Sequence, residues 1–178
     1  MNRLILGIIV AMIVLITIYQ AVFREEHLRY NITGNLSDEM HVIFYDSSGE
    51  RVATATLMNR GLHGECMSFR FSLWHEEGTK IKSLKLKLTP SATSEIYLKT
   101  PDGYPWNPIK LQHSEDAHSI IFEVPDLGFQ GKGTITLDFM VLPLEESDNL
   151  SIHFDIEFGM SRGLKEYVGE GSGILKLS

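Results

Sequence analysis

The chain has 178 residues, with 16 Lys+Arg against 23 Asp+Glu, a formal net charge of −7 at pH 7 and a single cysteine. Arg3 is the only charged residue before position 24, so residues 24–178 keep 15 of the basic residues and all 23 acidic ones. An acidic domain of this size excludes nucleic acid as a default partner, and one cysteine excludes a disulfide-stabilised scaffold.

The chain begins with a long uncharged stretch, Leu4 to Phe23, of 20 residues. A helix of that length spans about 30 Å, the thickness of the hydrocarbon core of a bilayer. A cleaved secretory signal would need small residues at its end, whereas Tyr19 lies two positions before Ala21. We therefore predict that residues 1–23 form a short cytoplasmic tail and an uncleaved transmembrane helix, with residues 4–23 in contact with membrane lipid.

Charges on either side of the stretch predict its orientation. Arg3 and the terminal amine precede it, whereas the charges of Arg24, Glu25, Glu26 and Arg29 cancel after it. The positive-inside bias then leaves the N-terminus in the cytoplasm and the remaining chain outside the cell membrane. Within the helix, the small residues Gly7 and Ala11 share one face and predict close packing against another membrane helix, either of a second copy or of a larger complex.

Residues 24–36 are predicted to be a juxtamembrane segment, and two N-glycosylation acceptor patterns begin there, at Asn31 and Asn35. A third begins at Asn149. These patterns suggest a glycoprotein on the outer surface, although Asn and Ser/Thr also occur together in ordinary turns.

Residues 37–178 alternate between apolar and polar side chains, which is typical of half-buried strands. The clearest runs are 67–73, 84–88, 135–141 and 150–158, and weaker ones are 40–45, 52–58, 95–99, 109–113, 118–124 and 174–177. Turn-forming residues separate them at 46–49, 76–78, 101–103, 125–128 and 169–173. With no amphipathic helix between strands, we predict an all-β fold for residues 37–178, an antiparallel two-sheet sandwich of immunoglobulin-like or jelly-roll-like kind.

Residues that could carry chemistry are scattered. The seven histidines stand singly, without the spacing that places two ligands on one metal, and Cys66 is expected to be a thiol without chemistry. If runs 135–141 and 150–158 pair as a hairpin, Asp138 would lie beside Asp155 and Glu157, most simply as a solvated face and alternatively as a calcium site. We predict no catalytic residue, no metal and no cofactor.

The segment 100–108 is the most unusual part of the sequence, because three prolines stiffen it around Tyr104 and Trp106. Rigid aromatic residues in a loop make good anchors for a partner, although such residues also fold back onto a core. We therefore take Tyr104 and Trp106 as the candidate partner-binding residues.

These observations predict a membrane-anchored, surface-exposed sandwich that acts as a non-catalytic binding or structural module for envelope proteins or glycans. One alternative is an accessory subunit of a larger membrane or surface-filament complex, held through the transmembrane helix. Another is a metal-dependent exported enzyme or electron carrier built on the dispersed histidines.

Overall fold

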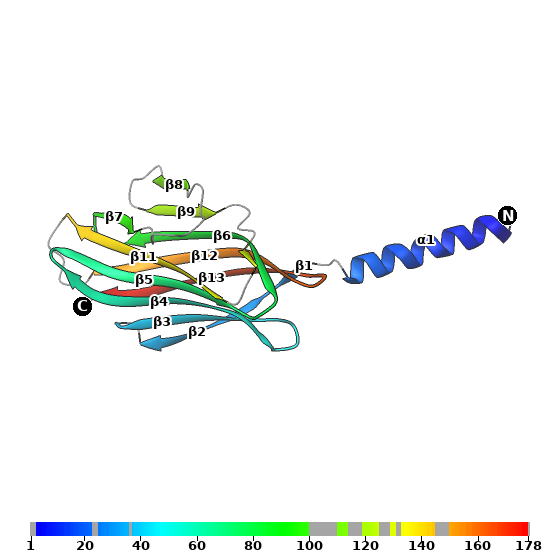
Figure 1. The fold of residues 1–178 in the computed structure, drawn as a ribbon, viewed down its shortest axis with the longest axis horizontal. Helices are drawn as coiled ribbons and strands as arrows, with labels where there is room; N and C mark the ends of the chain where they lie inside the picture. Colours follow the sequence, from blue (N-terminus) through cyan, green and yellow to red (C-terminus); the bar gives the residue numbers. More distant parts are fainter. Residues whose placement is uncertain are drawn as a thin grey trace.

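The computed structural model describes residues 3–22, 25–35, 37–99, 110–113, 119–124, 129–130, 133–144 and 150–177. One helix, α1 (Arg3–Val22), extends away from a sandwich of two sheets (Figure 1). The prediction of a two-sheet β-sandwich preceded by an N-terminal helix is confirmed.

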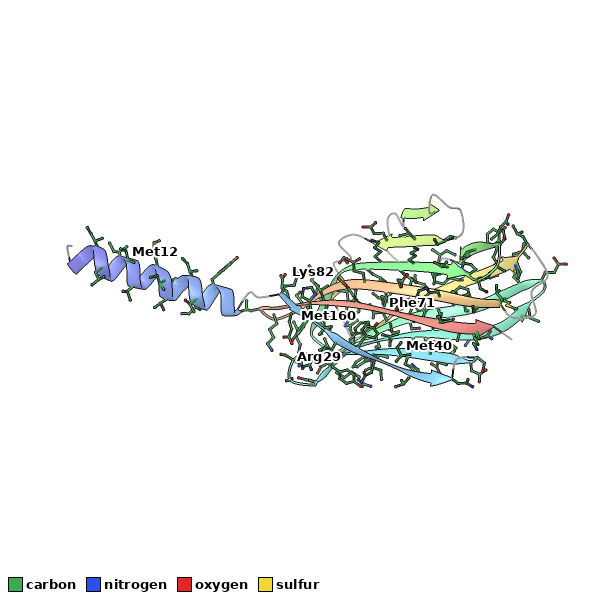
Figure 2. The ribbon with its side chains drawn as sticks, turned by 180° about the vertical axis from the view of Figure 1, so that it is seen from behind. Met12, Arg29, Met40, Phe71, Lys82 and Met160 are labelled. Carbon is green, nitrogen blue, oxygen red and sulfur yellow. The ribbon has the colours of Figure 1, made fainter. Side chains whose placement is uncertain are left out.

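Apolar side chains cover α1 all round, as with Met12, and they are exposed (Figure 2). Within the residues that the structure describes, no helix is both long and apolar enough to count as a membrane span. The membrane role of α1 therefore stays a prediction.

The first sheet, called sheet A, follows the order β1-β13-β12-β6-β9-β8, with β10 also pairing with β6. Its strands are β1 (Glu25–His27), β6 (Thr79–Pro90), β8 (Lys110–His113), β9 (Ile120–Val124), β10 (Phe129–Gln130), β12 (Leu150–Arg162) and β13 (Lys165–Leu177). All of its pairings are antiparallel except that of β1 with β13, which is parallel.

The second sheet, called sheet B, follows the order β2-β3-β4-β5-β11-β7 and is antiparallel throughout. Its strands are β2 (Arg29–Asn35), β3 (Glu39–Tyr45), β4 (Arg51–His63), β5 (Cys66–His75), β7 (Ser94–Lys99) and β11 (Gly133–Pro143). Every strand run predicted from alternation overlaps one of the observed strands.

The core lies between the sheets and is rich in phenylalanine. Phe69 stacks on Phe139 within sheet B, with ring centroids 5.3 Å apart, and Phe44 meets Phe158 of sheet A edge-on at 4.8 Å. Phe71 and Met40, labelled in Figure 2, belong to the same buried core. Alternation forces this arrangement, because successive side chains of a strand point to opposite faces and each sheet turns its apolar face inward.

The turn between β3 and β4 falls at the predicted 46–49 and is held by a buried carboxylate. Asp46 Oδ1 accepts hydrogen bonds from Ser48 N at 2.9 Å, Ser48 Oγ at 2.6 Å and Glu50 N at 2.9 Å. These donors, the Ser48 hydroxyl above all, lower the pKa of Asp46, although burial opposes them. Gly49 completes the turn with a positive φ of 86°.

The N-terminal boundary of the sandwich differs from the one predicted at residue 37. Residues 25–27 pair with β13 and residues 29–35 pair with β3, so the expected juxtamembrane segment supplies one edge strand to each sheet. Leu28, where the chain passes from sheet A to sheet B, is buried, and its N–H donates to Val168 O at 2.8 Å. β1 has only three residues, and β2 has only two apolar residues in alternation, Tyr30 and Ile32, so the apolar pattern was too short to reveal either strand.

The hairpin expected between runs 135–141 and 150–158 does not form, because β11 belongs to sheet B and β12 to sheet A. Asp138 is paired instead with Arg70 of the neighbouring β5, while Asp155 and Glu157 face outward from sheet A. The cluster of three carboxylates that would have offered a calcium site is therefore absent from the described residues.

The predicted turn at 169–173 is also wrong, since these residues lie inside β13. Gly169, Gly171 and Gly173 face inward, and a Cβ on any of them would meet core side chains, such as the Phe158 ring at Gly169. The glycines are needed because the rings of the core fill the space that their side chains would occupy.

Candidate functional site

The residues predicted for binding are only partly placed. Tyr104, Trp106 and Asn149 lie outside the described residues, so the aromatic loop stays a prediction. Gly7 and Ala11 lie exposed on α1, and nothing lies within 4 Å of the position a Gly7 Cβ would take. What the described residues do offer is the outer face of sheet B, which no other described element covers (Figure 1).

The centre of that outer face, called the B face, consists of three rows of side chains that cross β3, β4, β5 and β11. In order of the strands, the first row is Ile43, Thr54, Trp74 and Thr134, the second is His41, Thr56, Ser72 and Thr136, and the third is Glu39, Met58, Arg70 and Asp138. Rows lie about 7 Å apart and strands about 4.8 Å apart, so the B face measures about 14 by 14 Å.

The first row presents the only tryptophan of the described residues. Trp74 is partly exposed near the end of β5, and the Arg51 guanidinium carbon lies 4.6 Å from the centroid of its ring. This cation–π contact holds the indole against the sheet and fixes its orientation. On either side, Thr54 and Thr134 are its cross-strand neighbours.

The second row is made of short hydroxyl side chains. His41 Nδ1 lies 3.0 Å from Thr56 Oγ1, and Ser72 and Thr136 continue the row across the sheet, all of them partly exposed. Hydroxyls both donate and accept hydrogen bonds, and on strands their spacing is fixed by the backbone. The row is therefore a regular array of polar groups with little conformational freedom to lose on binding.

The third row carries charge. Arg70 Nε and a terminal nitrogen of the same guanidinium donate to the two carboxylate oxygens of Asp138, at 2.7 and 2.9 Å. This bidentate pair raises the pKa of Arg70 through the hydrogen bonds to Asp138. Beyond it, a hollow of about 270 Å³ is bounded by the pair and by Arg60 and Leu62 of β4.

Two of the three predicted glycosylation sites flank the B face. Asn31 and Asn35 lie on β2, exposed, next to β3 and on the outward side of sheet B. The Asn35 amide is engaged locally, because Nδ2 donates to Asp38 Oδ2 at 2.9 Å and Oδ1 accepts from the Ser37 hydroxyl at 3.0 Å. The Asn31 side chain makes no such hydrogen bond with another described residue.

The described residues offer no metal centre. No group of three or more His, Cys, Asp or Glu side chains among them comes close enough to hold an ion. Cys66 is a free, partly buried thiol at the β4–β5 hairpin, and His75, near the other end of β5, is buried, which lowers its pKa. Chemistry at metal ions therefore has no support from this part of the chain.

Sequence reasoning missed Trp74, Arg51 and Arg70, although a signal for two of them was present. The alternation that turns Phe69, Phe71 and Leu73 inward also turns Arg70 and Trp74 outward on the same strand. The outward positions of β5 therefore identify Arg70 and Trp74 from the sequence. Arg51 is identified only by its contact with Trp74 in the folded structure.

Comparison with known proteins places the chain in a family. Residues 25–176 match the family described as "Domain of unknown function (DUF8121)", and the chain belongs to it. The match begins at β1, in agreement with the start of the sandwich. Curated proteins offer no match.

Among solved structures, the chain is similar to the collagen-binding domain from a Staphylococcus aureus adhesin, at 13% identity and a TM-score of 0.39, over 62% of this chain and 87% of that one. It is also similar to the human F-spondin reeler domain, at 10% identity and a TM-score of 0.36, over 66% of this chain and 81% of that one.

Proposed function

We propose that this member of the DUF8121 family is a non-catalytic binding module that presents the B face to an extended carbohydrate of the cell envelope. The observation that carries the proposal is the array of partly exposed hydroxyls beside Trp74 on a sheet face that no described element covers. A glycan offers many hydroxyls and flat, weakly polar ring faces, which match the second and first rows respectively.

Carbohydrate is favoured over a protein partner by the composition of the middle row of the face. Protein interfaces are enriched in large aromatic, Met and Arg side chains at their centre and depleted in Ser. Trp74, Met58 and Arg70 in the outer rows would suit either partner, but the middle row has the opposite character, with Thr56, Ser72 and Thr136. An envelope protein remains the second partner class, and the binding test below separates the two.

The proposal includes an anchor. α1 would hold the sandwich at the outer surface of the cell membrane, with its N-terminus in the cytoplasm. In support, the run from Leu4 to Phe23 has no charge, and α1 extends away from the sandwich with exposed apolar side chains (Figure 1). Extraction of native membranes tests this: the chain should resist carbonate and dissolve in detergent, and release by carbonate alone would contradict the anchor.

Binding is tested with the full chain in detergent micelles and an insoluble polysaccharide fraction from the native envelope, scored by co-sedimentation. Trp74→Ala should weaken binding by about 30-fold, the effect of losing a central aromatic contact of about 2 kcal/mol. Ser72→Arg should do the same by blocking the middle row while leaving the core intact. Ile174→Ala, on the outer face of sheet A, is the matched control and should bind as the wild type does.

Two outcomes would overturn the proposal. One is retention of full binding by both B-face variants with unchanged circular dichroism. The other is binding that is abolished when the fraction is treated with protease but not when it is treated with glycosidases, because the partner would then be a protein.

A further inference from the structure

One edge of sheet A is left open by the described strands along most of β13. Among these strands, only β1 pairs with the outer side of β13, where it covers Glu166, Tyr167 and Val168. From Gly169 to Leu177, no described strand pairs with that side. An open edge exposes backbone N–H and C=O groups that can pair with another strand.

The contact at Leu28 shows which residues point to this edge. Leu28 N donates to Val168 O at 2.8 Å, so the backbone groups of Val168 face away from β12. Because this direction alternates along a strand, Glu170, Ser172, Ile174 and Lys176 also turn their N–H and C=O groups outward. The odd-numbered residues between them pair with β12.

Sheet B overhangs this edge. A Cβ on Gly171 would lie 3.0 Å from Val42 and Phe44 of β3, so β13 lies against β3. β2 is the next strand beyond β3, and it therefore lies over the space beside β13 (Figure 1). Its residues Tyr30 and Ile32, opposite Phe44 and Val42 in the register, are 42% and 49% exposed.

The open edge and the overhang together form what we call the β13 slot: the outward backbone of Glu170, Ser172, Ile174 and Lys176, covered on one side by Tyr30 and Ile32. A hollow of about 460 Å³ reaches this edge from the outer face of sheet A. Lys85, Lys87, Asp155 and Glu157 line it on β6 and β12, and Tyr30, Glu170, Gly171 and Ser172 line it at the edge. The slot thus combines a row of backbone hydrogen-bonding groups with an apolar cover.

Charges along the slot restrict what fits. The side chains of Glu170 and Lys176 are exposed on the outer face of sheet A, six residues apart, and neither makes an ion pair with another described residue. Opposite charges directly across two strands are favourable, and like charges are not. An antiparallel strand would therefore place a basic residue opposite Glu170 and an acidic one opposite Lys176.

We propose that the β13 slot accepts an extended segment of a partner protein, which adds one antiparallel strand to sheet A. The segment carries a basic residue opposite Glu170, an acidic residue opposite Lys176 and apolar residues at the intervening positions, where they pack against Tyr30 and Ile32. Strand addition of this kind takes affinity from the backbone and specificity from alternate side chains.

A second copy of β13 does not fit the same slot. In a two-fold arrangement, the β3 of the second copy would lie over its own β13 and so occupy the place that β2 already fills. Only a single extended segment, with no second sheet packed on it, can pass beneath β2.

The proposal is tested first without any partner, by hydrogen exchange of the full chain in detergent micelles. The amides of Glu170, Ser172, Ile174 and Lys176 should exchange at least tenfold faster than those of Gly171, Gly173 and Leu175. If all seven exchange equally slowly, the edge is already covered and the proposal fails.

The second test uses the synthetic peptide Glu-Val-Thr-Val-Thr-Val-Lys as the probe. Its binding should slow exchange at the four outward amides by at least tenfold. The peptide with proline at both threonine positions should not bind, and the charge-exchanged peptide Lys-Val-Thr-Val-Thr-Val-Glu should bind several-fold more weakly. Failure of the probe to protect these amides, or equal binding by the charge-exchanged peptide, would overturn the proposal.

A variant pair locates the binding. Ser172→Pro removes one outward N–H without touching the pairing with β12, and proline is tolerated at strand edges. It should weaken probe binding at least tenfold, whereas Ser172→Ala should bind as the wild type does. Should Ser172→Pro fail to fold, Glu170→Lys gives the second test. It leaves each charged peptide with one attractive and one repulsive pair, so it should abolish the preference between them. Unchanged binding by a folded Ser172→Pro, or a dimer that this substitution disrupts, would contradict the assignment.

Discussion

Substitution of the inward glycines of β13 tests the packing of the core, because the sign of the resulting change in stability shows whether the space at each glycine is filled. In an exposed strand where the backbone permits it, Gly→Ala stabilises a protein by about 0.4–1 kcal/mol, because it restricts the unfolded chain. At Gly169 the new methyl group would lie 2.5 and 2.8 Å from two Phe158 ring carbons and closer still to Cζ. Gly169→Ala should therefore destabilise the sandwich.

The size of the effect follows from how little Phe158 can move. Its ring is 1% exposed and lies edge-on to Phe44, at 4.8 Å between centroids and 88° between planes. Overpacking of a well-filled core costs about 1–3 kcal/mol, and this site belongs at the upper end. For a domain of this size, about 3 kcal/mol lowers the Tm by about 6–12 °C. Gly171→Ala, whose methyl would meet its neighbours at 3.0 Å, should cost less.

Thermal unfolding followed by circular dichroism measures both values. Ser172→Ala is the matched control, because it lies on the same strand and faces outward, and it should shift the Tm by less than about 2 °C. The packing argument is refuted if Gly169→Ala melts at or above the wild-type temperature.

Three further predictions concern other parts of the sandwich. A double-mutant cycle on Arg70 and Asp138 should give a coupling of about 0.5–1 kcal/mol, since both side chains are partly exposed, and zero coupling would show that the bidentate pair is not formed in solution. Burial lowers the pKa of His75, so its contribution to stability should be full above about pH 6.5 and fall as the pH drops below that value. In urea unfolding, His75→Gln should make the midpoint fall less steeply with decreasing pH. If the midpoint falls as steeply as in the wild type, other groups cause the loss of stability. In a host that glycosylates Asn-x-Ser/Thr patterns, glycopeptide mapping should find Asn31 more fully modified than Asn35, whose amide is engaged, and the reverse order would contradict this reading.

Alternation was sufficient to find the strands because each sheet has one buried face. The runs predicted at 67–73, 135–141 and 150–158 all lie within observed strands, and their apolar residues fill the core. Which strands pair with one another was harder to predict, because strand pairing depends on contacts between residues distant in sequence. β11 and β12 are neighbours in the chain but belong to different sheets.

The turn predicted at 169–173 was wrong because glycine serves two structural purposes. The same residue that permits a turn also permits close approach of a ring, and only the position of Phe158 across the core distinguishes the two. The candidate site could also be predicted only in part from the sequence. Trp74 could be placed outward by alternation, but the flat array around it appears only once β3, β4, β5 and β11 are aligned in register.

The central claim, that the B face is the binding surface, is tested most directly by photo-crosslinking in native membranes. A benzophenone amino acid would replace Ser72 in the middle of the B face and, in a second variant, His153 on the outer face of sheet A. The account predicts carbohydrate adducts, identified by mass spectrometry, at position 72 and none at position 153. Equal adducts at both positions, or adducts at position 153 alone, would contradict it.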